Sequence, residues 1–248
     1  MPKLISDREL TGSPVVANNT MNRERGLSGV NSYTRELGFD PAVRLASAGA
    51  DAAWLDLCSG EGRALVEAAR ALPAAAEFTG VDLVGPLATP PDPAAVPALR
   101  LVTAAIADWE PRRRYHLITC VHGLHYLGDQ LAAITRAASW LTPDGLFAAH
   151  LDPDSLRWAD GSAAARPVLA ALRAAGFSYR ARRHLLTLEG GREVRLPFDY
   201  LGADPAAGPN WTGQPAVASH YRDASRHRAS SPPVLRPPAV PVRTDLPG

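Results

Sequence analysis

The sequence predicts an α/β fold: a doubly wound, seven-stranded, mainly parallel sheet that ends in an antiparallel hairpin, with an N-terminal helical cap. Short apolar runs alternate with helix-like stretches from Ala52 to Ala175, which is the pattern of βαβ units. After Gly176, two strand-like runs follow with no helix between them, as expected for an antiparallel hairpin at a sheet edge. A length of 248 residues with 46% hydrophobic residues suits one domain with one sizeable core.

Five apolar runs have the length and composition of buried parallel strands. They span residues 52–58, 78–83, 99–104, 116–122 and 145–151. Helices are expected after the first, fourth and fifth of these strands, and Pro143 ends the second helix. These helices span residues 60–72, 130–141 and 162–175.

The remaining connections differ from this regular pattern. Five prolines between residues 84 and 98 predict that any crossover helix there is short or broken. The strand-like runs at 177–188 and 192–200 are separated by Glu189-Gly190-Gly191, which is a hairpin signal.

Four segments follow from these patterns. Apolar residues recur at helical spacing before the first strand, at Leu27, Val30, Tyr33 and Leu37, and Pro41 can start a second short helix. The stretch after Asp204 is rich in Pro, Gly, Ala and Arg, with Trp211 and Tyr221 as possible anchors on the body. The predicted segments are a flexible arm at 1–20, the helical cap at 21–50, the main domain at 51–203, and a Pro/Arg-rich flap with a disordered tail at 204–248.

The composition excludes several classes of protein. The net charge of +1 gives no general attraction to nucleic acid or to an anionic membrane. No apolar run has the length of a membrane span, and the first twenty residues hold no apolar signal region, so we expect a cytoplasmic protein. Cys58 and Cys120 are too few for a disulfide scaffold or a zinc site. The oligomeric state is left open.

A nucleotide-binding turn follows the first predicted strand, at residues 56–62. Gly60 and Gly62 let backbone N–H groups approach a ligand, and the following helix presents its unpaired donors there. Twenty residues later, Asp82 ends the second strand, where a carboxylate can accept hydrogen bonds from both ribose hydroxyls. A glycine turn followed by a strand-end acid predicts a nucleoside site.

Two residues favour S-adenosylmethionine (SAM) over a nicotinamide dinucleotide. The dinucleotide fingerprint needs a third glycine where this chain has Leu65. Asp56 would repel a pyrophosphate, whereas a carboxylate suits a ligand that carries an ammonium and a sulfonium group.

From about Asn22 to Tyr200 the chain resembles the class I SAM-dependent methyltransferases. Their first motif reads here Asp56-x-Cys58-x-Gly60-x-Gly62, with Cys58 in place of the first glycine. Asp82 matches the ribose acid and Leu83 lies beside the adenine, whereas Ala105 and Ile106 stand where the family has an adenine-binding acid and an apolar residue. Asp108, three residues after Ala105, is interpreted as a cap of the next segment.

The resemblance also implies how the methionine end of SAM is held. The fourth strand ends at Val121 and His122, where the family faces the methionine moiety and the acceptor, and Tyr33 and Arg25 lie in the cap that covers the ligand. The main domain is then a SAM-binding methyltransferase domain. The implied cofactor-binding residues are Asp56, Leu57, Cys58, Ser59, Gly60, Gly62, Asp82, Leu83, Ala105, Ile106, Val121, His122, Tyr33 and Arg25.

Two histidines are the candidate catalytic residues. His122 and His125 stand where the acceptor should approach, and histidine titrates in the range useful for a general base. Inert packing under the cap is about equally compatible with each of them. His150 and Asp152, at the end of the fifth strand, could line the acceptor pocket, but no third partner at metal spacing is evident, so no metal site is predicted.

The sequence therefore predicts a SAM-dependent methyltransferase for an O or N atom of a small organic acceptor, in specialised natural-product biosynthesis. An RNA or protein methyltransferase is the first alternative, with the flexible basic tail in its favour and no Asn/Asp-Pro-Pro-aromatic motif after the fourth strand. A non-catalytic SAM-binding protein is left open by Cys58 and Ala105. A nicotinamide-dependent oxidoreductase is disfavoured by Leu65.

Overall fold

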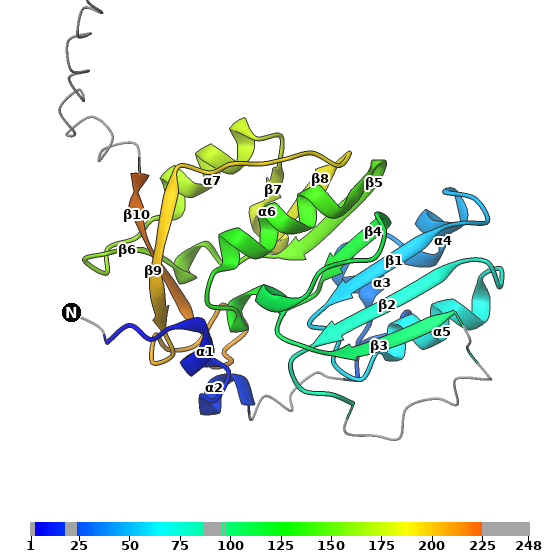
Figure 1. The fold of residues 1–248 in the computed structure, drawn as a ribbon, viewed down its shortest axis with the longest axis horizontal. Coiled ribbons are helices and arrows are strands. Elements are labelled where there is room, and N and C mark those ends of the chain that lie inside the picture. The colour runs from blue at the N-terminus through cyan, green and yellow to red at the C-terminus, as the bar shows by residue number, and fades with distance from the viewer. Residues whose placement is uncertain (1–2, 18–23, 87–95, 97, 225–248) are drawn as a thin grey trace, which may run out of the picture.

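A computed structural model describes residues 3–17, 24–86, 96 and 98–224 (Figure 1). Its main sheet has seven strands in the order β3-β2-β1-β4-β5-β8-β7. The five strands from β3 to β5 are parallel, and β8 pairs antiparallel with both β5 and β7. This confirms the predicted seven-stranded, mainly parallel sheet with an antiparallel hairpin. The strands are β1 Ala53–Leu57, β2 Glu77–Asp82, β3 Leu99–Thr103, β4 Tyr115–Cys120, β5 Leu141–His150, β7 Ser178–Arg180 and β8 Leu185–Glu189.

Helices cover both faces of this sheet, as in other doubly wound folds. One hydrophobic cluster joins one face of the sheet to α6 and α7, and a second joins the opposite face to α3, α4 and α5. Their bounds are α3 Tyr33–Leu37, α4 Pro41–Ala46, α5 Arg63–Ala71, α6 Gln130–Trp140 and α7 Ala165–Ala174. None of the helices in the described part of the chain has the length and apolar content of a membrane span.

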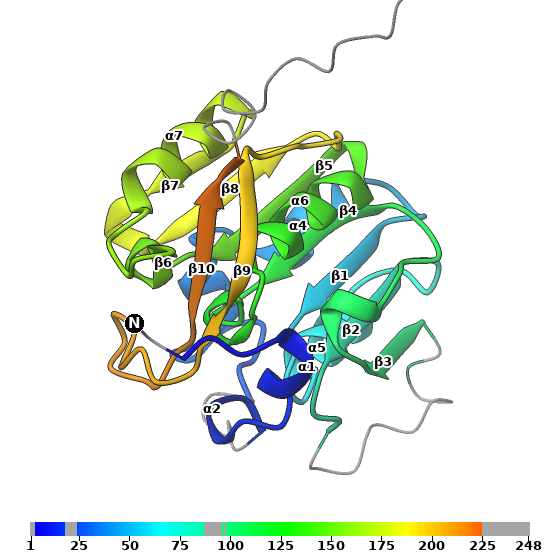
Figure 2. The same cartoon turned by 60° about the vertical axis from the view of Figure 1, so that its left-hand side comes forward.

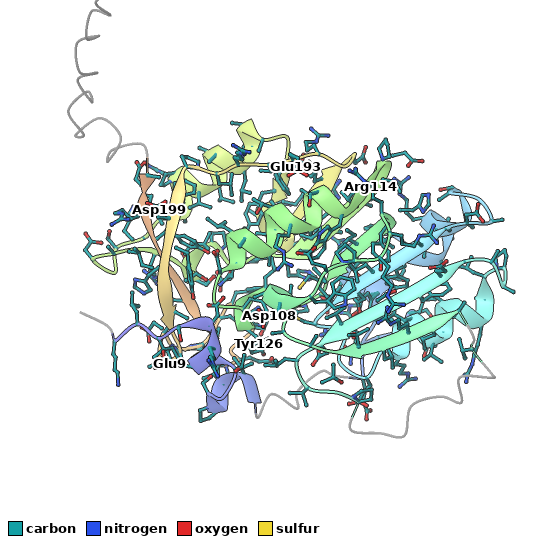
Figure 3. The ribbon with its side chains drawn as sticks, in the orientation of Figure 1. Glu9, Asp108, Arg114, Tyr126, Glu193 and Asp199 are labelled. Carbon is teal, nitrogen blue, oxygen red and sulfur yellow. The ribbon has the colours of Figure 1, made fainter. Side chains whose placement is uncertain are left out.

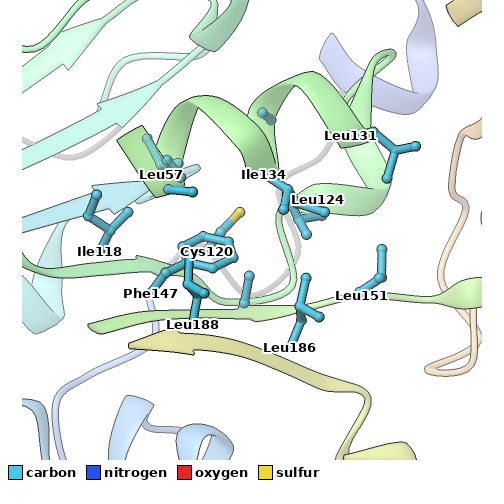
Figure 4. Close-up of a cluster of buried hydrophobic side chains, with 14 of the residues drawn as sticks. Leu57, Ile118, Cys120, Leu124, Leu131, Ile134, Phe147, Leu151, Leu186 and Leu188 are labelled. Atoms are coloured by element: carbon cyan, nitrogen blue, oxygen red, sulfur yellow. The ribbon is translucent and has the colours of Figure 1, made fainter. Parts of the chain in front are cut away.

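The core explains why the apolar runs fold as central strands. Leu57, Ile118 and Phe147, on three adjacent strands, are fully buried against Leu131 and Ile134 of α6 (Figure 4). Side chains of this size each stabilise the folded state by about 1.5–3 kcal/mol when they leave water. The carboxyl ends of the central strands, where the nucleotide turn lies, are therefore supported by a packed core.

A second, smaller sheet stands at the carboxyl ends of these strands (Figure 2). It has the order β6-β10-β9, in which β10 runs antiparallel to β9 and parallel to β6. The N-terminal segment joins it, because Ile5 forms a β-bridge with Ala203. The elements are β6 Leu156–Trp158, β9 Phe198–Asp204, β10 Ala218–Asp223 and the short helices α1 Asp7–Leu10 and α2 Pro14–Ala17.

The predicted position of the hairpin is wrong, because the chain reverses earlier than the predicted turn at residues 189–191. The run at 177–188 is not one strand, because the chain reverses at residues 181–184, where His184 has a φ of +49°, and the hairpin is β7–β8. The glycines at 190 and 191 instead carry the chain across the end of β5, with Gly190 N–H donating to the carbonyl of Gly145. Of the run at 192–200, only its last residues are strand, in β9 of the second sheet.

The N-terminal region also differs in detail from the sequence prediction. Residues 3–17, expected to form a flexible arm, carry α1 and α2. Among the described residues of the cap, 24–50, helix is restricted to α3 and α4, and Val30 is 83% exposed rather than on the buried face. The tail from residue 225 and most of the proline-rich stretch at 84–98 lie outside the described residues. The segment boundaries stay a prediction.

Candidate functional site

A cavity of about 580 Å³ opens at the carboxyl ends of β1, β2 and β4. Its floor is formed by the turns that follow these strands, and α1, α6 and β9 contribute to its other walls. The cavity brings together most of the residues that the sequence assigned to cofactor binding. Those that line it are Tyr33, Arg25, Cys58, Ser59, Gly60, Asp82, Leu83, Ala105, Ile106, Val121 and His122.

The turn after β1 is joined directly to the end of β2. The N–H of Gly60 donates to Oδ2 of Asp82 over 2.9 Å, and the N–H of Val84 donates to Oδ1 over 3.0 Å. Cys58 and Gly60 both have left-handed backbones, with φ of +56° and +59°. Asp82 therefore fixes the two turns that meet at the cavity while its carboxylate lines the cavity wall.

Three predicted cofactor-binding residues do not line the cavity. Leu57 is fully buried in the core, and Gly62 begins α5 with its Cα facing Leu101. Asp56 is 1% exposed and lies beneath the turn. These residues support the turn from behind.

Asp56 is held by two hydroxyl groups. Tyr33 donates to Oδ2 and Thr119 donates to Oδ1, each over 2.6 Å. Burial raises the pKa of Asp56 to about 7, although both hydrogen bonds act in the opposite direction. Asp56 thus acts on the cavity through Tyr33, whose side chain lines the cavity wall.

On the predicted adenine side, Ala105 and Ile106 line the cavity and Asp108 does not. The 3-10 turn at Ile106–Asp108 is fixed by Arg136 of α6, which donates to the carbonyl of Ile106 over 2.8 Å. Arg136 also lines the cavity, and nothing in the strand pattern predicted it.

The exit of β4 is packed tightly against the exit of β1. His122 has a left-handed backbone, with a φ of +55°. A Cβ atom on Gly123 would lie 2.4 Å from the Cβ of Cys58 and 2.8 Å from the Sγ of Cys120. The glycine is therefore required by the close approach of these two turns.

The two predicted catalytic histidines differ in their surroundings. His122 lines the cavity, and its Nε2 lies 3.0 Å from Oε2 of Glu36. His125 does not line the cavity, is 1% exposed, and neither of its ring nitrogens has a partner among the described residues. Burial lowers the pKa of His125 to about 3, so this imidazole is neutral.

Behind His122 lies a cluster of histidine, glutamate and tryptophan side chains. The rings of His122 and His150 stack with centroids 4.2 Å apart, and His150 Nε2 lies 3.9 Å from Oε2 of Glu36. Trp211, from the loop between β9 and β10, stacks on His122 and on His184. The hydrogen bond to His122 lowers the pKa of Glu36 to about 2, so Glu36 is charged.

The roof of the cavity is formed by α1, β9 and the loop after β9. The sequence predicted a flap after Asp204, but it did not place α1 at the cavity. Tyr200 of β9 donates to Oδ1 of Asp7 over 2.6 Å, and Tyr126 (Figure 3) donates to Gln214 over 3.0 Å. One signal was available: Ser6 and Glu9 form a capping box, the sequence signature of a helix start.

Comparisons with known proteins bear on the same region. A family model described as a methyltransferase domain matches residues 31–188. A search of curated proteins found no significant match.

Among solved structures, the chain is similar to a SAM-bound amino pentose methyltransferase from Micromonospora echinaspora involved in calicheamicin biosynthesis, with 23% identity, coverage of 48% of this chain and 50% of that chain, and a TM-score of 0.37. It is similar to a plantazolicin methyltransferase in complex with a triazolic analogue and S-adenosylhomocysteine, with 14% identity, coverage of 58% of this chain and 52% of that chain, and a TM-score of 0.37. It is also similar to a putative sarcosine dimethylglycine methyltransferase from Galdieria sulphuraria, with 18% identity, coverage of 44% of this chain and 43% of that chain, and a TM-score of 0.35. The matches span about half of each of these chains or less.

Proposed function

Because this chain belongs to the family of methyltransferase domains, we propose that it transfers a methyl group from SAM to an O or N atom of a small organic acceptor. The observation that carries this proposal is the cavity at residues 58–60, where Asp82 ties the nucleotide turn to the end of β2. We place the reaction in natural-product biosynthesis and in the cytoplasm, as the sequence predicts.

The cofactor half of the cavity suits a nucleoside. A carboxylate can accept several hydrogen bonds at once, so Asp82 can hold the Gly60 turn and receive ribose hydroxyls. Leu83, Ala105 and Ile106 supply an apolar surface for an adenine ring. Asp108 does not line the cavity, whereas Glu110, two residues further along the chain, does.

The acceptor half extends from His122 toward the roof. Tyr126, Gln214 and Tyr200 give it polar groups, and Leu10 of α1 adds an apolar one. A volume of about 580 Å³ falls within the range of small-molecule sites, roughly 300–1,000 Å³. This enclosure favours a small acceptor over RNA or a protein chain.

Methyl transfer from a sulfonium is an in-line displacement, so the protein mainly aligns the two reactants and keeps them dry. An acceptor that arrives protonated must also lose a proton. Of the two histidines proposed as the base, His122 lines the cavity and His125 does not.

The test is calorimetric titration of the full chain with S-adenosylhomocysteine. Asp82→Ala removes charge-assisted hydrogen bonds worth about 1.5–3 kcal/mol each, so we expect affinity to fall at least about tenfold. The matched control is Asp108→Ala, an acid that follows the neighbouring strand and lies outside the cavity lining (Figure 3). Failure of the wild type to bind, or equal loss in both variants, would contradict the assigned site. Transfer of a labelled methyl group from SAM to an oxygen or nitrogen nucleophile separates an enzyme from a non-catalytic binder.

A further inference from the structure

Three side chains with metal-binding atoms converge next to the cavity. Glu36 comes from α3, His122 follows β4, and His150 ends β5. One ligand atom from each residue lies within 4.8 Å of the other two. These residues are 86 and 28 positions apart along the chain, which is why sequence spacing gave no sign of the group.

We propose that Glu36, His122 and His150 bind a divalent first-row transition-metal ion. Two imidazoles and one carboxylate form a ligand set that suits zinc, iron(II) and related ions, and leaves coordination positions open. Hard ions such as Mg²⁺ and Ca²⁺ prefer all-oxygen sites and fit this set poorly.

The spacing fits a shared ion after a small adjustment. Ligand atoms about 2.1 Å from one ion lie at most about 4.2 Å apart. The Oε2 atom of Glu36 is 3.0 Å from His122 Nε2 and 3.9 Å from His150 Nε2. Glu36 is 29% exposed, so it can move by the required fraction of an ångström and an ion can reach it from solvent.

His150 provides an independent sign that a partner belongs in this cluster. It is 2% exposed, and its Nδ1 has no hydrogen-bond partner among the described residues. Buried polar groups in folded proteins are almost always paired, and an unpaired one destabilises the fold. Nε2 is the nitrogen that lies near Glu36, so an ion pairs the unpartnered Nδ1 when the ring turns to face the ion with that atom.

The imidazole rings are packed against aromatic neighbours. His150 stacks on His122 at an interplanar angle of 11°, and Trp211 packs over His122 with centroids 5.4 Å apart. Trp211 in turn lies parallel to His184, at 4.4 Å. Because a ring nitrogen binds an ion in the plane of its ring, one of the two nearly parallel imidazoles has to turn for both to reach the same ion.

One cation lies close to the cluster. Arg25 Nη2 is 3.8 Å from Oε1 of Glu36, whereas both histidines approach Oε2. Arg25 and the histidines thus approach different oxygens of the carboxylate, and the oxygen nearest the imidazoles is the one available to an ion.

An ion at this site would lie next to the acceptor half of the cavity, because His122 belongs to both. A nitrogen bound to a metal cannot also accept a proton. In the metal-loaded protein His122 is therefore a ligand rather than the general base predicted from the sequence, and the ion itself lowers the pKa of an oxygen or nitrogen group that binds it.

The test uses the full-length protein freed of metal with EDTA and titrated with CoCl₂ in the absence of SAM and acceptor. We expect visible absorption bands that saturate at one Co²⁺ per chain and that ZnCl₂ displaces. Loss of a group that merely orients a ligand weakens metal binding about 10–100-fold, so Glu36→Gln and His150→Asn should each weaken it at least about 100-fold. Binding that is equally tight in both variants, or absent from the folded wild type, would overturn the proposal.

The matched control is His184→Asn, which removes a histidine of the same aromatic stack that lies outside the ligand group. Asparagine tolerates the left-handed backbone of this position, so Co²⁺ affinity should be retained. An equal loss in His184→Asn would also count against the site. Circular dichroism checks the fold of each variant. X-ray absorption of the Co²⁺-loaded wild type, which needs no substitution, should show two imidazole ligands, and their absence would overturn the assignment.

Discussion

The hydroxyl of Tyr33 donates a 2.6 Å hydrogen bond to the carboxylate of Asp56 and so joins the N-terminal cap to the first strand of the sheet. The Tyr33 ring also packs edge-on against Trp54, with centroids 5.8 Å apart. This hydrogen bond to a buried carboxyl group is one of the contacts that hold the cap, together with the contact of Glu36 with His122.

Tyr33→Phe should destabilise the protein by about 1.5–3 kcal/mol, because it removes one of the two donors to a buried carboxylate. Tyr115→Phe is the control, since this buried tyrosine donates over 3.3 Å to the neutral hydroxyl of Thr79 and should lose only about 1 kcal/mol. The measurement is urea unfolding of both variants at neutral pH. Equal losses would mean that the contact with Asp56 has no special weight.

Asp56 should make stability depend on pH. Its folded-state pKa of about 7 lies above the ordinary value of 3.8, so the folded protein holds a proton that the unfolded chain has released. The stability contribution is complete below about pH 4 and is lost as the pH rises through 7, at about 1.4 kcal/mol per unit of pKa difference.

Asp56→Asn, which can still accept from Tyr33, removes this dependence. The difference in unfolding free energy between Asp56→Asn and wild type should therefore rise in favour of the variant between about pH 4 and pH 7, the range bracketed by the two pKa values. Taking the difference between the two proteins removes the pH dependence that the buried imidazoles contribute to the unfolding free energy, which has the opposite sign. Parallel stability curves for the two proteins would refute the assignment.

Gly123→Ala should destabilise the protein by about 1–3 kcal/mol, since the new Cβ would lie 2.4 Å from the Cβ of Cys58. The two turns that meet there must then separate, and affinity for S-adenosylhomocysteine should fall as well. Gly12→Ala is the control, because the nearest atom to its new Cβ is 3.7 Å away. Thermal unfolding and calorimetry measure both effects. A stable Gly123→Ala protein with wild-type affinity would show that the turns are not tightly coupled.

Tyr200→Phe should loosen α1 without unfolding the domain. It removes the 2.6 Å hydrogen bond to Asp7, and hydrogen bonds to charged groups are worth about 1.5–3 kcal/mol. Hydrogen exchange at the amides of Leu10 and Thr11 should accelerate by roughly tenfold or more, since each 1.4 kcal/mol is about a factor of ten. Tyr179→Phe, whose hydroxyl donates to Leu151, should leave these amides unchanged.

The sequence was sufficient for the parts of the molecule that repeat a local pattern. Alternating strands and helices predicted the order of the main elements from β1 to β5, and the glycine turn with its strand-end acid picked out Gly60 and Asp82, which line one cavity. Both predictions rest on local patterns that can be recognised in a single sequence.

Pairings between residues far apart in the chain could not be predicted from the sequence. The second sheet joins β6 to β10 across some sixty residues, for example His220 with Arg157, and no local pattern marks such a pair. His184 broke a strand-like run because its backbone is left-handed, a conformation that composition does not reveal. Glu36 contacts His122 because of the way α3 packs on the sheet, which the sequence does not show. The sequence does show that Glu36 follows Tyr33 by one helical turn, so these two residues lie on neighbouring parts of one helix face.

The two halves of the cavity are encoded in different parts of the chain. The proposed cofactor half comes mainly from residues 58–121, with Arg25 and Tyr33 of the cap, whereas the roof comes from α1 near the beginning and β9 with Gln214 toward the end. The roof can accordingly be exchanged between related genes, or randomised in a library, without altering a codon of the nucleotide turn. On the proposed assignment of the two halves, changes in α1 and β9 would alter the acceptor side while leaving the proposed SAM-binding turn unchanged.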